Sequence, residues 1–189
     1  MNLIKRLFDI SISIFLILIL IWLFFLLAIL VKISSKGPVI HWSSRIGMNN
    51  RLFEMPKLRS MKIDSPNVAT HLLKDTDSHL TPIGSFLRKT SLDELPQLFS
   101  ILKGDMSLVG PRPALFNQYD LILMREEKNI NTLVPGITGW AQVNGRDELT
   151  ISDKVDFDYE YLKKKSFWFD LKVLWMTLLK VIWRDGISH

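Results

Sequence analysis

The sequence predicts an α+β protein that is mainly helical and has two parts. Residues 1–36 form a membrane-embedded helix with its flanks, and residues 37–189 form a small cytosolic, membrane-associated domain with short strands and interfacial amphipathic helices. Three observations predict this class. A long apolar stretch carries no charge, short extended stretches between Gly and Pro turns follow it, and several later segments repeat apolar residues at helical spacing.

The composition of the 189 residues limits the kinds of partner and chemistry. The formal net charge of +5 favours anionic partners, namely nucleic acid, acidic lipid or phosphate-bearing substrates. Nucleic acid is disfavoured, because the basic residues are scattered and the chain carries a membrane segment. There is no cysteine, which excludes disulfides, thiol nucleophiles and cysteine-ligated zinc, and which fits a reducing compartment.

The apolar stretch runs from Ile10 to Val31 and consists mostly of Ile, Leu and Phe. A straight helix of that length measures about 33 Å, enough to cross a bilayer core. It is too long for the apolar region of a signal peptide, and no small-residue cleavage site follows. Both flanks are basic, so the positive-inside rule sets no orientation. A single span and a re-entrant helix with both ends cytoplasmic remain open.

Short strands are expected next, from Val39 to Trp42 and around Phe53, separated by a turn at residues 47–51. In an extended stretch Lys57 and Arg59 lie on the same side, because strand side chains alternate. These two cations either contact phosphate groups or line a solvated strand edge.

The acidic pair Asp93–Glu94 lies at the start of a predicted helix. Ser91 and Glu94 match a capping box, although Pro96 also fits a first turn and allows a slightly later start. One apolar stripe is expected at Leu95, Leu98, Phe99 and Leu102, with a stop at Gly104. Acidic residues in a first turn also favour the helix dipole, so the helix pattern leaves capping and catalysis both open.

Arg112 is the second component of the candidate site. It stands between Pro111 and Pro113 in a loop that also contains Gly110, so the backbone on either side of it is restrained. Arginine presents a planar fork of donors suited to phosphate. A carboxylate can attack phosphorus to give an acyl phosphate, or it can hold Mg²⁺. Paired carboxylates and a restrained guanidinium therefore indicate metal-assisted phosphate chemistry.

The C-terminal third is expected to be mostly helical, with helices at residues 114–131, 151–165 and 167–183. Residues 135–139 are predicted to form a loop whose glycines permit close approach to a ligand, and Arg146 offers a further cation after it. Trp140 either stacks on a base or sugar or belongs to the core. The last helix carries a stripe of Trp168, Trp175, Leu179 and Ile182, which fits an interfacial helix or an ordinary core-packed one.

Five ordered blocks resemble the bacterial sugar transferases, and more narrowly the small monotopic polyprenyl-phosphate phosphoglycosyl transferases. The resemblance covers nearly the whole chain. The blocks are Lys5-Arg-Leu-Phe-Asp9, Pro56-Lys-Leu-Arg-Ser-Met61, Ser91-Leu-Asp-Glu-Leu-Pro-Gln-Leu98, Lys103-Gly-Asp-Met-Ser-Leu-Val-Gly-Pro-Arg-Pro113 and Pro135-Gly-Ile-Thr-Gly-Trp-Ala-Gln-Val-Asn-Gly-Arg146.

The resemblance implies an enzyme that transfers a phosphosugar from a UDP-sugar to undecaprenyl phosphate, releases UMP and starts synthesis of a surface glycan. Asp93 would be the nucleophile that forms a covalent phosphosugar intermediate and would bind Mg²⁺, and Glu94 would assist in proton transfer or in orienting the lipid phosphate. The substrate-binding residues implied are Lys57, Arg88, Arg112, Arg146 and Asp170.

The same resemblance implies a re-entrant membrane helix, with the catalytic domain on the cytoplasmic face of the bacterial inner membrane. Two positions depart from the family pattern. The middle of the apolar stretch, Leu20–Leu23, lacks the Ser-Pro pair that breaks the helix in other members, and Val134 stands where a basic residue is common. The alternative function is a non-catalytic membrane adaptor that binds anionic lipid or a protein partner. The sequence leaves open the sugar, the glycan pathway and whether the chain forms an oligomer.

Overall fold

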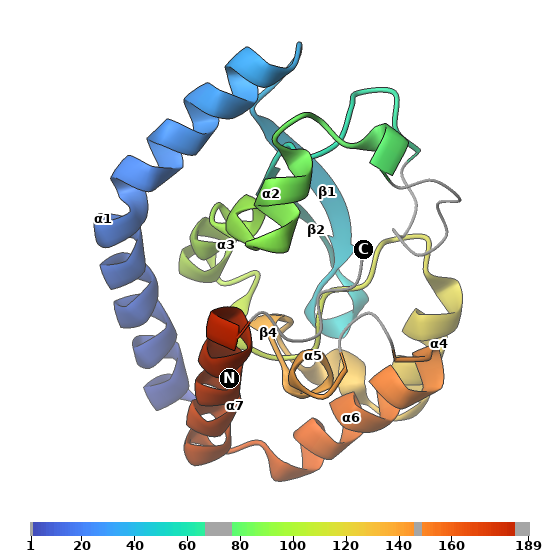
Figure 1. The fold of residues 1–189 in the computed structure, drawn as a ribbon. Helices are drawn as coiled ribbons and strands as arrows, with labels where there is room; N and C mark the ends of the chain where they lie inside the picture. Colours follow the sequence, from blue (N-terminus) through green and yellow to red (C-terminus); the bar gives the residue numbers. More distant parts are fainter. Residues whose placement is uncertain (1, 67–76, 146–148, 184–189) are drawn as a thin grey trace.

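The computed structural model describes residues 2–66, 77–145 and 149–183, and these form a mainly helical α+β fold, as predicted (Figure 1). The longer helices are α1 Leu3–Ser34, α2 Gly84–Lys89, α3 Gln97–Lys103, α4 Tyr119–Glu127, α5 Trp140–Val143, α6 Ile151–Lys164 and α7 Phe167–Trp183. The strands are β1 Ile40–Ile46, β2 Leu52–Leu58, β3 Ser107–Val109 and β4 Gly136–Thr138. Four 3₁₀ turns are η1 Met48–Asn50, η3 Asp77–His79, η4 Leu92–Glu94 and η5 Ile130–Thr132.

Helix α1 is continuous over 32 residues and curves along one side of the molecule beside α3 and α7 (Figure 1). Its inner face packs along its length: Ile12 and Leu16 join one hydrophobic cluster, and Leu27 and Val31 join a second. Its outer face is apolar and exposed; Trp22, for example, is 81% exposed. Within the described residues it is one helix that is long and apolar enough to cross a membrane, which fits membrane association.

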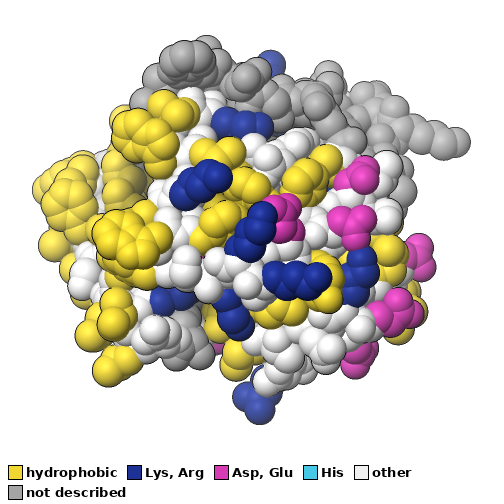
Figure 2. All heavy atoms as spheres, turned by 90° about the horizontal axis from the view of Figure 1, so that it is seen from below, with side chains coloured by type: hydrophobic (Ala, Val, Ile, Leu, Met, Phe, Trp, Pro, Cys, Tyr) yellow, Lys and Arg dark blue, Asp and Glu magenta, His cyan; other side chains and the backbone are white. Residues whose placement is uncertain are grey.

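The face seen from below shows how charge is distributed around this apolar side. Hydrophobic side chains gather where α1 lies, Lys and Arg side chains stand beside them, and acidic side chains gather toward the opposite side (Figure 2). The exposed lysines at the end of α6 and on α7 are Lys163, Lys164, Lys165 and Lys172. An apolar surface bordered by cations is typical of a surface that meets anionic lipid.

Strands β1 and β2 form a hairpin around the predicted turn at residues 47–51. They are antiparallel, with Ile40 opposite Leu58 and Arg45 opposite Phe53. The turn between them uses the left-handed backbone of Asn49, with φ of 55°, a conformation that asparagine tolerates better than most residues. Both strands extend further than the sequence pattern indicates.

The predicted loop at residues 135–139 is wrong in part, because its centre is strand β4, parallel to β3. Two glycines allow this pairing. A Cβ on Gly136 would lie 2.1 Å from the amide nitrogen of Gly110, a distance that no side chain permits. The close approach predicted for a ligand is therefore an approach of two backbones, and it fixes the segment that leads to Arg112.

Two helix predictions need correction. Helix α3 begins at Gln97 and turns Leu98 and Ile101 to the core, so Phe99 is 51% exposed rather than part of the buried stripe. Its predicted stop is confirmed, because Gly104 adopts φ of 101°. The helix expected over 114–131 is only α4, since its first residues pair with the hairpin: the Ile46 N–H donates to the carbonyl of Ala114.

Helices α6 and α7 agree with the expectation. On α7, Val173 is buried while Trp168 and Trp175 are 78% and 61% exposed. One side of this helix thus packs on the core, and the tryptophan side faces outward.

Candidate active site

The acidic pair lies in the 3₁₀ turn η4, directly before Pro96 and α3. The capping-box prediction is wrong: Ser91 has a left-handed backbone with φ of 55°, and its side chain makes no capping hydrogen bond to this turn. A capping residue needs an extended backbone to aim its oxygen at the turn. The carboxylate of Glu94 is therefore not engaged in capping and points elsewhere.

Glu94 binds two cations from distant segments. Its Oε1 atom lies 2.7 Å from Nη2 of Arg112 and 3.1 Å from Nζ of Lys57. Burial alone would raise the pKa of Glu94, but the charges and hydrogen bonds of Arg112 and Lys57 hold that pKa well below its usual range. Glu94 is therefore ionised at neutral pH and fixes both cations beside the turn.

Asp93 is the less engaged member of the pair. It is 7% exposed, and in the described part of the chain its carboxylate accepts no hydrogen bond. Burial raises the pKa of Asp93; the charge of Lys57 opposes this rise and that of Glu94 adds to it. The result is a nearly buried carboxylate that accepts no hydrogen bond from the described residues, next to a fixed cationic group.

Other predicted cations are placed around the pair to different degrees. Arg88 on α2 lies close enough for its charge to lower the pKa of Asp93, although burial outweighs this effect. Arg146 lies outside the described residues. Arg59 is buried and points away from the site, since it donates to the carbonyls of Ser35 and Lys36 at the end of α1. Neither Lys57 nor Arg59 lies on a solvated strand edge.

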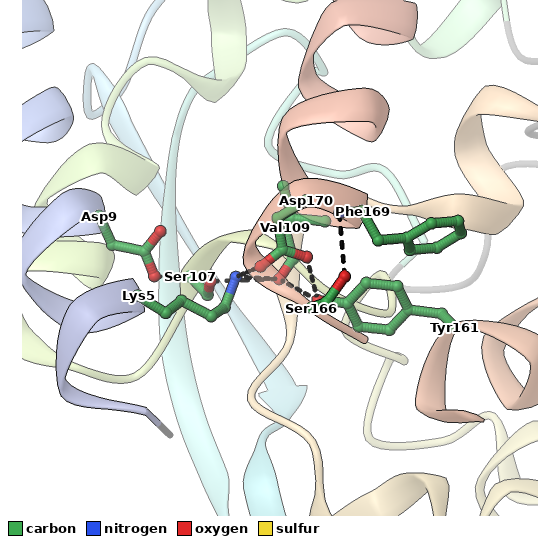
Figure 3. Close-up of polar contacts among 8 residues, drawn as sticks. All are labelled: Lys5, Asp9, Ser107, Val109, Tyr161, Ser166, Phe169 and Asp170. Atoms are coloured by element: carbon green, nitrogen blue, oxygen red, sulfur yellow. Dashed lines mark hydrogen bonds and ion pairs between the residues drawn. The ribbon is translucent and has the colours of Figure 1, made fainter. Parts of the chain in front are cut away.

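Asp170 belongs to a second cluster, which joins α1, β3, α6 and α7 (Figure 3). Its two oxygens accept from Nζ of Lys5 at 2.6 Å and from the hydroxyl of Tyr161 at 2.7 Å. Both donors also reach the carbonyl of Val109, at 3.2 Å and 3.3 Å. Burial, together with the adjacent Asp170, raises the pKa of the Tyr161 hydroxyl well above its usual range. The cluster supports the start of the Arg112 loop, and its described contacts do not include the acidic pair.

The carboxylate of Asp93 suits a metal ion that binds together with a phosphate-bearing substrate. In residues 2–66, 77–145 and 149–183, no group of three or more His, Asp and Glu side chains is arranged to hold a metal. Mg²⁺ commonly takes one or two protein carboxylates and completes its shell with substrate phosphates and water. Asp93, which accepts no hydrogen bond within the described ranges, fits that pattern.

Comparison with known proteins identifies the group to which the chain is related. Residues 1–184 match the family model described as bacterial sugar transferase.

The chain belongs to the bacterial sugar transferase family.

Individual relatives agree with this assignment. The uncharacterized sugar transferase EpsL of Bacillus subtilis (strain 168) is 41% identical over 99% of this chain and 91% of its own length. The undecaprenyl-phosphate glucose phosphotransferase of Komagataeibacter xylinus is 42% identical over 94% of this chain but 36% of its own. The UDP-glucose:undecaprenyl-phosphate glucose-1-phosphate transferase of Escherichia coli (strain K12) is 40% identical over 95% of this chain and 40% of its own length. The chain thus spans less than half of the last two proteins.

Two arginines that contact the Arg112 loop of this bacterial sugar transferase were not predicted from the sequence as site residues. Arg45 on β1 donates to Ser43 and to the carbonyl of Pro113; burial, with the charge of Arg112, lowers its pKa to about 10. Arg125 on α4 donates to the carbonyl of Arg112. The alternation of Ser43 and Arg45 along a strand offered a weak signal for the first, whereas no local pattern indicates the second.

Proposed function

We propose that the chain transfers a sugar 1-phosphate from a UDP-sugar to undecaprenyl phosphate and releases UMP. The names of several relatives describe transfer of a sugar phosphate to undecaprenyl phosphate, with glucose, galactose or N-acetylgalactosamine as the sugar, which supports the reaction class but not one sugar. The unequal use of the two adjacent carboxylates carries the proposal for this chain. Glu94 binds two cations, whereas Asp93, held beside it, accepts no hydrogen bond from the part of the chain that the structure describes.

Asp93 is the nucleophile in the proposed mechanism. One carboxylate oxygen attacks the sugar-side phosphorus of the UDP-sugar, the bond from that phosphorus to the bridging oxygen breaks, and UMP leaves with that oxygen. The product is an aspartyl phosphosugar. A phosphate oxygen of undecaprenyl phosphate then attacks the same phosphorus, and the carboxylate of Asp93 leaves unchanged.

The surrounding cations stabilise the charge that develops on the phosphoryl oxygens. Arg112, whose side chain is 36% exposed, binds Glu94 through Nη2 and presents its positive charge beside Asp93. Lys57 and Arg88 add positive charge near Asp93. Arg146 remains a predicted substrate-binding residue. The same predicted role for Asp170 competes with its bonds to Lys5 and Tyr161, and the activity of Asp170→Asn decides between the two roles. Glu94 fixes Arg112 and Lys57, and orients the lipid phosphate through them.

Mg²⁺ would be held by Asp93 together with the diphosphate of the substrate. When bound, the ion would shield phosphate charge and so permit the approach of a carboxylate.

How α1 is held at both ends supports our proposal for the membrane arrangement. At its start, Lys5 and Arg6 bind Asp170 and the carbonyls at the end of α3. At its other end, Arg59 binds the carbonyls of Ser35 and Lys36. A helix of about 48 Å whose two ends bind one polar body begins and ends on the same side of the bilayer, as the re-entrant arrangement requires and a span does not allow. We place the catalytic domain on the cytoplasmic face of the inner membrane, where Asp93 can meet a lipid phosphate.

A screen of UDP-sugars for UMP release tests the proposal. Purified protein in undecaprenyl-phosphate vesicles with Mg²⁺ should release UMP from at least one sugar, and mass spectrometry should find a phosphosugar on Asp93 when the acceptor is left out. The Asp93→Asn variant should form no adduct. A folded protein that releases no UMP from any UDP-sugar would instead support the membrane adaptor.

A further inference from the structure

The backbone that carries Arg112 has all its neighbouring acceptors occupied. Each carbonyl of residues 111–114 accepts a hydrogen bond. Backbone groups serve the outer two: the Gly136 N–H donates to Pro111 and the Ile46 N–H donates to Ala114, both at 2.9 Å. These bonds attach the loop to β4 on one side and to β1 on the other.

Side chains serve the inner two carbonyls. Nη1 of Arg125 donates to the carbonyl of Arg112 at 2.9 Å, and Nη1 of Arg45 donates to the carbonyl of Pro113 at 3.2 Å. Pro113 and Ala114 beside them are buried, so water does not serve this backbone; the two arginine side chains satisfy these carbonyls and fix the backbone in place.

The guanidinium of Arg125 is itself fixed in direction. Its Nε and Nη2 atoms both donate to Oδ2 of Asp158, at 3.0 Å and 2.6 Å. The side chain of Arg125 is 12% exposed and that of Asp158 is 1% exposed. A guanidinium is planar, so two bonds to one carboxylate leave Nη1 aimed in a single direction, toward Arg112.

A second ion pair between the same two segments shows what simple cross-linking looks like. Lys128, at the end of α4, lies 2.5 Å from Asp156 on α6, and their side chains are 36% and 62% exposed. None of the described hydrogen bonds and ion pairs of these two residues reaches the loop. Burying an ion pair costs desolvation that an exposed pair avoids. Joining the two helices therefore does not explain why Arg125 and Asp158 are buried.

We propose that Arg125, held by Asp158, is a positioning residue that sets the place of Arg112 in the candidate active site. It acts through the carbonyl of Arg112 and does not touch substrate. The inference rests on the proposed role of Arg112 as a phosphate ligand, and it adds to that role a support from α4 and α6.

A double-mutant cycle tests it. Arg125→Met should lower kcat/KM for UMP release about 30-fold, since misplacing a binding group by about 1 Å costs up to about 100-fold. In an Arg112→Ala background the same change should cost less than about 3-fold, because the residue that it positions is gone. Lys128→Met, the matched control, should change kcat/KM less than 2-fold in either background. Independent, multiplying losses for Arg125→Met would overturn the proposal.

Stability and binding measurements separate positioning from folding. Asp158→Asn keeps the volume of the side chain but weakens its bonds to Arg125. At a temperature where this variant is fully folded, kcat/KM for UMP release should fall as it does in Arg125→Met. The control Asp156→Asn should leave kcat/KM unchanged. If Arg125→Met does not fold, Asp158→Asn replaces it in the cycle. The affinity for UDP, measured by calorimetry, should show the same coupling to Arg112. Coupling in UDP binding without turnover on any UDP-sugar would contradict the proposed function alone, whereas turnover without coupling would contradict only the positioning role.

Discussion

The acidic pair before α3 and the carboxylate of Asp170 on α7 are both buried beside cations, but their oxygens are used differently. Both oxygens of Asp170 accept short hydrogen bonds, from Lys5 and Tyr161. At the pair, one oxygen of Glu94 takes two cations and Asp93 takes none of their hydrogen bonds. A carboxylate whose two oxygens both accept hydrogen bonds joins secondary-structure elements. A buried carboxylate that accepts none, next to fixed cations, is able to bind a ligand.

The largest loss of activity is expected when Asp93 is substituted. Asp93→Asn should lower UMP release at least about 1,000-fold, because it removes the proposed nucleophile, and should shift the melting temperature by only a few degrees. Steady-state UMP assays and calorimetric melting check both. A folded Asp93→Asn enzyme with full turnover would remove Asp93 from its assigned role.

Glu94→Gln should come next, with a loss of about 100-fold and of about 2 kcal/mol in the free energy of unfolding. The amide cannot hold Arg112 and Lys57 as a carboxylate does. Glu54→Gln is the control, since Glu54 is an exposed carboxylate on β2 that bonds only Ser44 among its described contacts. Equal losses of activity and stability in Glu94→Gln and Glu54→Gln would contradict the role of Glu94 in holding Arg112 and Lys57.

Asp170→Asn should reverse the balance between stability and activity. Breaking a buried ion pair costs about 3 kcal/mol, so the denaturant midpoint should fall clearly, while the activity of each folded molecule should fall less than about 10-fold. Urea unfolding and activity measured on the same sample give both values. An activity loss as large as that of Glu94→Gln, with little change in stability, would place Asp170 in the substrate site after all.

The smallest effect concerns pH, where the two regions act at opposite ends. The pKa of Glu94 is lowered, so its contribution to stability is present above about pH 4.5 and is lost as the pH falls below that value. The pKa of Tyr161 is raised, so its contribution is present below about pH 10 and is lost as the pH rises further. The free energy of unfolding should fall above pH 10 by up to about 1.4 kcal/mol per pH unit more than in Tyr161→Phe. Parallel curves for the two proteins would contradict the raised pKa.

Local patterns predicted the parts that depend on neighbouring residues. The apolar period of α6 and α7, the uncharged stretch within α1 and the glycine stop of α3 each follow from residues within a turn of one another. The family blocks predicted the acidic pair and Arg112 in the same way, as short strings of residues.

The sequence by itself determined that Asp93, Glu94 and a restrained Arg112 exist and that an apolar helix precedes them. Only the tertiary structure decided that Glu94, and not Asp93, accepts the hydrogen bonds of Arg112 and Lys57. The capping box was a sound local reading of Glu94, yet its partners come from 37 and 18 residues away. The same holds for β4, for Arg45 and for Arg125, whose contacts all lie in segments distant along the chain. Such pairings depend on how the loops close and how the helices pack, and neither is encoded in the spacing of adjacent residues.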